Sequence, residues 1–222
     1  MRTLRRVLLV LLAVGALGSQ FLTAPTASAD TAAQDTVRIV PSQRVYGETR
    51  GELMTELWTY EYQRHVGDPN PECLSFGKDD KVLAGVDALD STCTIRHGRP
   101  VIMFWSATCD TGSPPPWYAV TEADQIQCAR ELLTQDNEYV KVSVDGVATT
   151  FSTPAFEVIS RQFSYVSPVD NPFGYVPGPG TASGFSWVAM VYLPKGHHVL
   201  HLQVKYAYGP GFTTTKTVDV VP

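Results

Sequence analysis

The sequence has 222 residues, a formal net charge of -5 and 44% hydrophobic residues. An acidic chain without a run of lysine or arginine lacks the positive surface that nucleic acids and anionic membranes require, so neither partner is expected. The length suits one domain of ordinary size with a substantial core.

The first 29 residues have the three parts of a cleavable secretory signal: a basic start with three arginines, an apolar run over 7–17, and small residues at Ala27 and Ala29. The apolar run is shorter than the ~20 residues of a membrane span. We therefore predict a signal peptide over 1–29 and a single exported, soluble, extracellular domain over 30–222. Its formal charge is -8, because cleavage removes three arginines and no acidic residue from a chain of charge -5. The oligomeric state is not predicted.

Helical spacing begins after Gly47, where Leu53, Met54, Leu57 and Trp58 recur at intervals of three and four residues. This spacing predicts a helix over about 47–64 with one buried stripe.

Three glutamates, Glu48, Glu52 and Glu56, share another face of that helix. They have the chemistry of acid/base catalysts or calcium ligands. Acidic residues are also favourable near a helix N-terminus, on a solvated face, and we expect this structural role.

Four cysteines follow: Cys73, Cys93, Cys109 and Cys128. An even number in an exported chain normally forms disulfides. The spacing leaves three pairings open, and we expect the sequential one, Cys73 with Cys93 and Cys109 with Cys128, in which each bridge closes a loop of roughly 20 residues and stabilises by ~3 kcal/mol. The alternative is a zinc site, although the C-x-x-C spacing typical of such sites is missing.

Short apolar runs at 82–86 and 101–105 predict strands, the second buried on both faces. Thr121-Glu122-Ala123-Asp124 is similar to a capping box and predicts a helix over about 122–135.

After this helix the apolar pattern has the period of strands. Asp145-Gly146 predicts a two-residue hairpin turn, and 168–184 a long Pro/Gly-rich loop. Strands are expected at 139–144, 147–151, 156–159, 163–166, 185–193, 199–208 and 213–221. The predicted fold is mainly β, an antiparallel β-sandwich such as a jelly roll, with two peripheral α-helices.

Three of the five histidines lie within five positions, at His197, His198 and His201. In a strand, His197 and His201 share a face ~13 Å apart and His198 points the other way, whereas ring nitrogens on one zinc ion lie ~3 Å apart. A helix would give the H-E-x-x-H spacing, but His198 stands where the glutamate base belongs. We expect a strand, no metal site and no cofactor; a site shared with His65 or His97 stays open.

Signatures of a catalytic nucleophile are missing, since Ser183 lies one place late for a G-x-S-x-G elbow. The sequence contains carboxylate pairs such as Asp79 with Asp80 and Asp87 with Asp90. A glycosidase needs two acids ~5 to 9 Å apart, so a secreted hydrolase that uses such a pair is the alternative function.

Aromatic residues indicate a different function. Trp117 and Tyr118 follow three prolines, and Tyr175 lies in the long loop. Rings held by a stiff segment can stack on sugars or peptides at a small entropic cost. Trp117 can also fold back to cover an end of the sandwich. We predict a non-catalytic extracellular binding module for carbohydrate, cell-envelope material or protein, with Trp117, Tyr118 and Tyr175 as its binding residues.

Five stretches carry a further resemblance: Y-G-E at 46–48, C-T-I at 93–95, G-R at 98–99, V-S-P-V-D-N at 166–171 and G-H-H-V-L-H at 196–201. Together they make most of the exported chain similar to a family of secreted bacterial proteins, common in actinobacteria, that has no established activity. The chain departs from this family in the first helix, where a tryptophan cluster is reduced to Trp58. The resemblance implies a packing role for His198 and His201 and is silent about mechanism.

Overall fold

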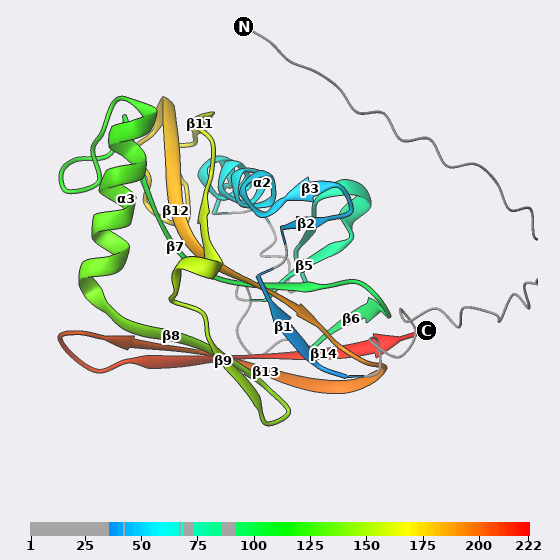
Figure 1. Cartoon of the computed structure of the whole chain (residues 1–222). Helices are drawn as coiled ribbons and strands as arrows, with labels where there is room; N and C mark the ends of the chain where they lie inside the picture. Colours follow the sequence, from blue (N-terminus) through cyan, green and yellow to red (C-terminus); the bar gives the residue numbers. More distant parts are fainter. Residues whose placement is uncertain (1–35, 42, 67, 69–72, 86–91) are drawn as a thin grey trace, which may run out of the picture.

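The computed structural model describes residues 36–41, 43–66, 68, 73–85 and 92–222, so the predicted signal peptide lies outside it. The described chain is 48% strand and 20% helix, which confirms the mainly β fold with two α-helices (Figure 1). None of the helices in these ranges is long and apolar enough to cross a membrane.

Most strands belong to two sheets. The larger sheet has the order β1-β12-β7-β5-β4, with β10 and β11 also paired to β12; the smaller has the order β6-β14-β13-β8-β9. The larger contains β1 (Arg38–Val40), β4 (Ser75–Phe76), β5 (Val82–Ala84), β7 (Val101–Asp110), β10 (Glu157–Ile159), β11 (Phe163–Ser167) and β12 (Gly178–Tyr192). The smaller contains β6 (Thr92–Arg96), β8 (Asn137–Val144), β9 (Val147–Thr150), β13 (Gly196–Tyr206) and β14 (Phe212–Val221). β2 (Arg44–Val45) and β3 (Glu48–Thr49) form a separate small hairpin.

Most pairs are antiparallel, as predicted, but β5 runs parallel to β7 and β6 runs parallel to β14. Both exceptions involve strands that lie before residue 97, in the segment where the sequence pattern is weakest. The sheets are therefore mixed.

The larger sheet is covered on both faces. Helix α2 (Arg50–Gln63) packs through Leu53, Met54 and Leu57 against one face, which includes Ile102 of β7. The other face, which includes Val101 of β7, packs against the smaller sheet and helix α3 (Glu122–Asp136). Neighbouring side chains of a strand point to opposite faces, so β7 is buried on both sides, as its continuous apolar run predicts.

The predicted loop at 168–184 is wrong in its last seven residues. Residues 178–182 pair with β11 and residues 182–184 pair with β7, so β12 begins at Gly178. The glycine at 180 looks like a loop signal, yet a Cβ there would lie 2.4 Å from the ring of Tyr165. Its role is to let that ring lie against the strand.

Both helices begin at a threonine cap. The side chain of Thr121 accepts a hydrogen bond from the backbone N–H of Asp124, as predicted for α3. At α2, Thr49 and Glu52 form a complete capping box, which also lowers the pKa of Glu52 because its carboxylate accepts two hydrogen bonds from Thr49.

The cysteines pair sequentially, as expected. Cys73–Cys93 links the chain before β4 to β6, and therefore joins the two sheets. Cys109–Cys128 links β7 to α3. The bridges fix the two sheets to one another and α3 to the central strand of the larger sheet.

The histidine tract is a strand, β13, and its rings have separate partners. His197 lies 2.7 Å from Asp219, and the Nδ1 of His201 lies 3.0 Å from the hydroxyl oxygen of Thr215. His198 is buried on the opposite face and contacts the carboxylate of Asp145 in the β8–β9 turn. In that turn Asp145 and Gly146 have φ of 50° and 86°, which is the backbone of the predicted two-residue hairpin.

Candidate functional site

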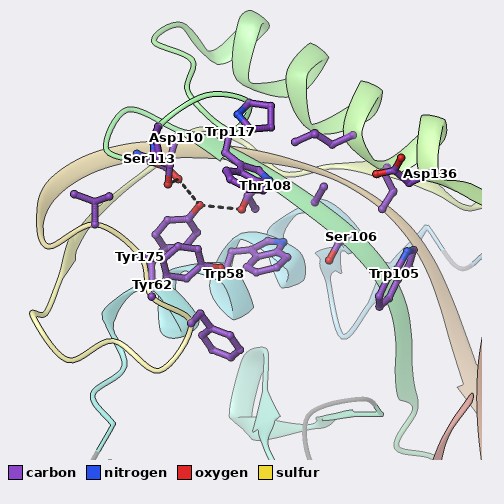
Figure 2. A pocket seen from close by; sticks show the side chains of 18 of the residues that line it. Trp58, Tyr62, Trp105, Ser106, Thr108, Asp110, Ser113, Trp117, Asp136 and Tyr175 are labelled. Carbon is purple, nitrogen blue, oxygen red and sulfur yellow. Dashed lines mark hydrogen bonds between the residues drawn. The ribbon is translucent and has the colours of Figure 1, made fainter. Parts of the chain in front are cut away.

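A cavity of about 730 Å³ lies beside the C-terminal half of β7, between α2, α3 and the loop after β11. Figure 2 shows its aromatic side chains around the opening, with Asp110 and Asp136 at opposite ends. Its walls are mostly rings and small polar groups: Trp58, Tyr62, Trp105, Ser106, Ala107, Thr108, Asp110, Ser113, Pro114, Pro116, Trp117, Leu132, Leu133, Asp136, Asn137, Phe173, Gly174, Tyr175, Val176 and Tyr206. We call this cavity the aromatic groove. Its volume lies within the ≈ 300–1,000 Å³ typical of ligand sites.

Two of the three predicted binding residues line this groove. Trp117 is 50% exposed, and Tyr175 is partly buried because its ring stacks on Tyr62 at a centroid distance of 3.8 Å. Tyr118 is equally exposed, but it lines a separate hollow of about 390 Å³ against α3. The adjacent side chains Trp117 and Tyr118 therefore belong to different surfaces.

The position of Trp117 depends on Asp110, at the end of β7. The backbone N–H of Asp110 donates to the carbonyl of Trp117, and the carbonyl of Asp110 accepts from the N–H of Ala119, both at 2.9 Å. The Asp110 carboxylate also accepts hydrogen bonds from the N–H groups of Gly112 and Ser113 at 2.7 and 2.6 Å. Hydrogen bonds to Asp110 therefore hold the loop both before and after Trp117.

The same carboxylate is buried and accepts three hydroxyl groups. They belong to Tyr62, at 3.0 Å, Tyr165, at 3.0 Å, and Ser113, at 2.8 Å. A buried charge is stable only where donors replace the lost water, and these five bonds supply that replacement. The Asp110 carboxylate therefore holds together the three segments that carry these hydroxyl groups at the wall of the groove.

Burial raises the pKa of Tyr62, Tyr165 and Tyr175 above the ordinary tyrosine value, and the negative charge of Asp110 raises each further. A neutral phenol can donate to the carboxylate, whereas a phenolate would repel it. The three hydroxyl groups therefore stay protonated in the folded protein at neutral pH.

The loop that carries Tyr175 is fixed at its base by Asn171, which is buried. The Asn171 amide lies 2.9 to 3.1 Å from the carbonyl oxygens of Glu61, Tyr62 and Arg64, where α2 ends. Helix C-termini leave carbonyls without partners, and this side chain provides a donor for them. The Arg64 guanidinium also lies 4.9 Å from the ring of Phe173. These contacts hold the loop to the end of α2.

A second cavity of about 380 Å³ adjoins the groove and shares Trp58, Trp105, Ser106 and Phe173 with it. Its remaining lining is Leu57, Glu61, Phe104, Leu202, Phe212 and Thr214. The Trp105 indole N–H donates to the side-chain oxygen of Asn137 at 3.0 Å. By contrast, the Trp58 indole nitrogen is buried and has no hydrogen-bond partner among the described residues. The Trp58 side chain thus lines both cavities, with its indole nitrogen covered by protein.

The other candidate groups have structural partners. Glu48 and Glu56 accept hydrogen bonds from the N–H groups of Lys78 and Gly77, so these two carboxylates hold the turn after β4. Asp79 forms an ion pair with Lys81, which lowers the Asp79 pKa. Ser183 is buried in β12 opposite Cys109 and lies in a strand, without the strand-to-helix turn of a nucleophile elbow.

The pair Asp87 and Asp90 lies outside the described residues. Within the described ranges, no three His, Cys, Asp or Glu side chains are grouped so that they could hold a metal ion.

Sequence reasoning missed most of the groove. Trp58 and Trp105 were expected only as apolar residues of a helix and a strand, and their meeting depends on tertiary packing. A signal for Asp110 was present, because an aspartate followed at the second position by glycine and then serine is typical of a side-chain-capped turn.

Comparisons with known proteins add no family. No family model matches the sequence, and no curated protein matches it. One solved structure, the solution structure of amebosin, is similar over 63% of this chain and 96% of its own, with 16% identity and a TM-score of 0.26. A likeness of that size supports no conclusion, so the resemblance to secreted bacterial proteins stays a prediction.

Proposed function

We propose that this protein is a non-catalytic extracellular binding module whose aromatic groove holds a carbohydrate chain. The observation that carries the proposal is the exposed ring of Trp117, held by Asp110 at a ligand-sized cavity that Trp58, Trp105 and Tyr175 also line. The faces of sugar rings are apolar, and flat aromatic side chains provide a matching surface.

The groove also has the polar groups that sugar hydroxyls need. Ser106, Thr108 and Asn137 contribute hydroxyl and amide groups to its lining. A few polar groups set among apolar walls are typical of sites that fix the orientation of a small ligand.

Rigidity supports binding as well. Asp110 fixes the loop of Trp117, and Asn171 fixes the loop of Tyr175. A site that is already ordered loses less conformational entropy on binding, so more of the contact energy appears as affinity.

The geometry favours binding over hydrolysis by paired carboxylates. Asp110 and Asp136 are the two acidic residues among the groove's described lining, and they lie at opposite ends of the opening. The Asp110 carboxylate already accepts five hydrogen bonds, whereas a catalytic acid or nucleophile must reach the bond that is cleaved.

An extracellular location is part of the proposal. The two disulfides support it, because such bonds persist in oxidising compartments.

The chain provides a matched pair of variants for the test. Trp117→Ala removes a ring from the groove, whereas Tyr118→Ala removes an equally exposed neighbour that lines the other hollow. Retention on immobilised chitin, chitosan, cellulose and purified cell-wall fractions would be measured for residues 30–222 and both variants. We expect Trp117→Ala to weaken retention at least tenfold and Tyr118→Ala to leave it within twofold. Retention that survives Trp117→Ala, or no retention of the parent on any of these materials, would contradict the proposal.

A further inference from the structure

The charges around the groove point to the chemical class of its ligand. We infer, on the basis of the proposed function, that the groove binds a cationic amino-sugar chain and that the Asp136 carboxylate receives one of its ammonium groups.

The charged residues in the described linings of the two cavities are all acidic. The aromatic groove contains Asp110 and Asp136, and the adjoining cavity contains Glu61. The described linings of both cavities include no lysine, arginine or histidine. A phosphorylated or uronic-acid polymer would meet only like charges there, whereas a protonated amine would meet opposite ones.

Asp136 is the carboxylate that is available to a ligand. The Asp110 carboxylate is occupied by five donors, and Glu61 is buried 3.7 Å from the Arg64 guanidinium. Asp136 is exposed, and its side chain has no hydrogen bond or ion pair within the described chain. It is also the last residue of α3, where the carbonyl end of the helix further favours a cation.

Aromatic rings line the same end of the groove as this carboxylate, as Figure 2 shows for Trp105. Asn137, the residue after Asp136, accepts from the Trp105 indole N–H at 3.0 Å and stands opposite Tyr206 in the sheet. The ring of Phe212 lies 5.3 Å from that of Trp105 and 6.0 Å from that of Tyr206. The faces of such rings attract ammonium groups, so the rings and the carboxylate select the same charge.

This end of the groove is separate from the Trp117 end, as Figure 2 shows for Asp136 and Asp110. Sugar rings can therefore stack near Trp117 while an amine further along the chain reaches Asp136. An extended oligosaccharide meets both requirements at once.

The test is calorimetric titration of residues 30–222 at pH 5.5 with two matched ligands, the hexamer of glucosamine and the hexamer of N-acetylglucosamine. The first carries protonated amines, and the second is neutral. We expect the glucosamine hexamer to bind at least tenfold more tightly, and only its affinity to fall when salt is raised from 50 to 500 mM.

Two variants that remove the same charge locate the effect. Asp136→Asn should weaken the glucosamine hexamer about tenfold and change the neutral hexamer less than twofold. The control is Glu138→Gln, because Glu138 is exposed two residues away and lies outside the described lining of the groove. This variant should leave both affinities within twofold.

The remaining outcomes of the titrations separate a failure of the charge inference from a failure of the proposed function. If the neutral hexamer binds as tightly as the charged one and Trp117→Ala weakens both, the proposed function stands and the charge inference is overturned. If neither hexamer binds, the charge inference is overturned, and retention on the immobilised polysaccharides decides the proposed function. A lysine hexapeptide that binds more tightly than the glucosamine hexamer overturns the assignment to a sugar.

Discussion

Asp110→Asn tests whether one buried carboxylate holds the aromatic groove in shape. Asparagine has nearly the same size, but its amide nitrogen accepts no hydrogen bond. If this nitrogen replaces the oxygen that faces Tyr62 and the Ser113 hydroxyl, both hydroxyl groups lose their charged acceptor; the other orientation would oppose the N–H groups of Gly112 and Ser113. At about 1.5 kcal/mol for each bond to a charged acceptor, the variant should lose about 3 kcal/mol of unfolding free energy. Tyr62 also lies 2.8 Å from the Thr108 hydroxyl, which keeps the estimate at the lower end of the range.

The assay is urea unfolding followed by tryptophan fluorescence, with the disulfides intact. Asp136→Asn is the control, since it makes the same chemical change at an exposed carboxylate on the same groove, and it should alter stability by less than about 0.5 kcal/mol. A loss below about 1 kcal/mol for Asp110→Asn, or equal losses for the two variants, would show that the Asp110 carboxylate does not hold the groove in shape.

Three further predictions concern stability. Replacing Cys73 and Cys93 by serine should lower the unfolding free energy by about 3 kcal/mol, and alkylation of the denatured, unreduced parent should find no free thiol; two thiols per chain would refute the pairing. The pKa of Tyr62 is raised by burial, so the unfolded chain releases a proton near pH 10 that the folded chain keeps. The unfolding free energy should therefore fall above about pH 10, and it should fall less steeply in Tyr62→Phe; equal slopes would contradict this account. His198→Ala leaves the Asp145 carboxylate without this buried partner and should lose about 2 kcal/mol in urea unfolding, whereas the exposed His197→Ala should lose much less.

The parts of the fold that the sequence predicted are those that depend on local pattern. The Asp145-Gly146 turn, the threonine cap of α3 and the alternation in β13 each depend on neighbouring residues. The disulfide pairing was predictable for a related reason, since both bridges join cysteines 19 or 20 positions apart. Short-range rules are sufficient for such features.

The errors come from long-range pairing. Residues 178–184 contain three glycines and a proline and are typical of a loop, yet they form the start of β12 because β11 and β7 lie on either side of them. The parallel pairing of β6 with β14 joins segments more than a hundred residues apart. No pattern within either segment specifies that partner.

The same limit applies to the site. Trp117 was found because its prolines mark a stiff segment, and Tyr175 because it lies in a Pro/Gly-rich loop. The groove also needs Trp58 from α2 and Trp105 from β7, whose patterns predict only core packing. The separation of Tyr118 from Trp117 depends on the hydrogen bonds between Asp110 and its loop, which bring the tryptophan to the groove and leave the tyrosine beside α3.

The four tryptophans of the chain can report directly on ligand binding in the aromatic groove. Three of them, Trp58, Trp105 and Trp117, line the aromatic groove, and Trp187 is buried between the two sheets and serves as an internal control. The indole N–H signals of ¹⁵N-labelled protein would be followed during titration with the glucosamine hexamer, with each signal assigned by a single Trp→Phe variant. The signals of the three groove tryptophans should shift together, with one common affinity, while the Trp187 signal stays in place. Saturation with ligand that leaves the three groove signals unmoved would contradict this prediction.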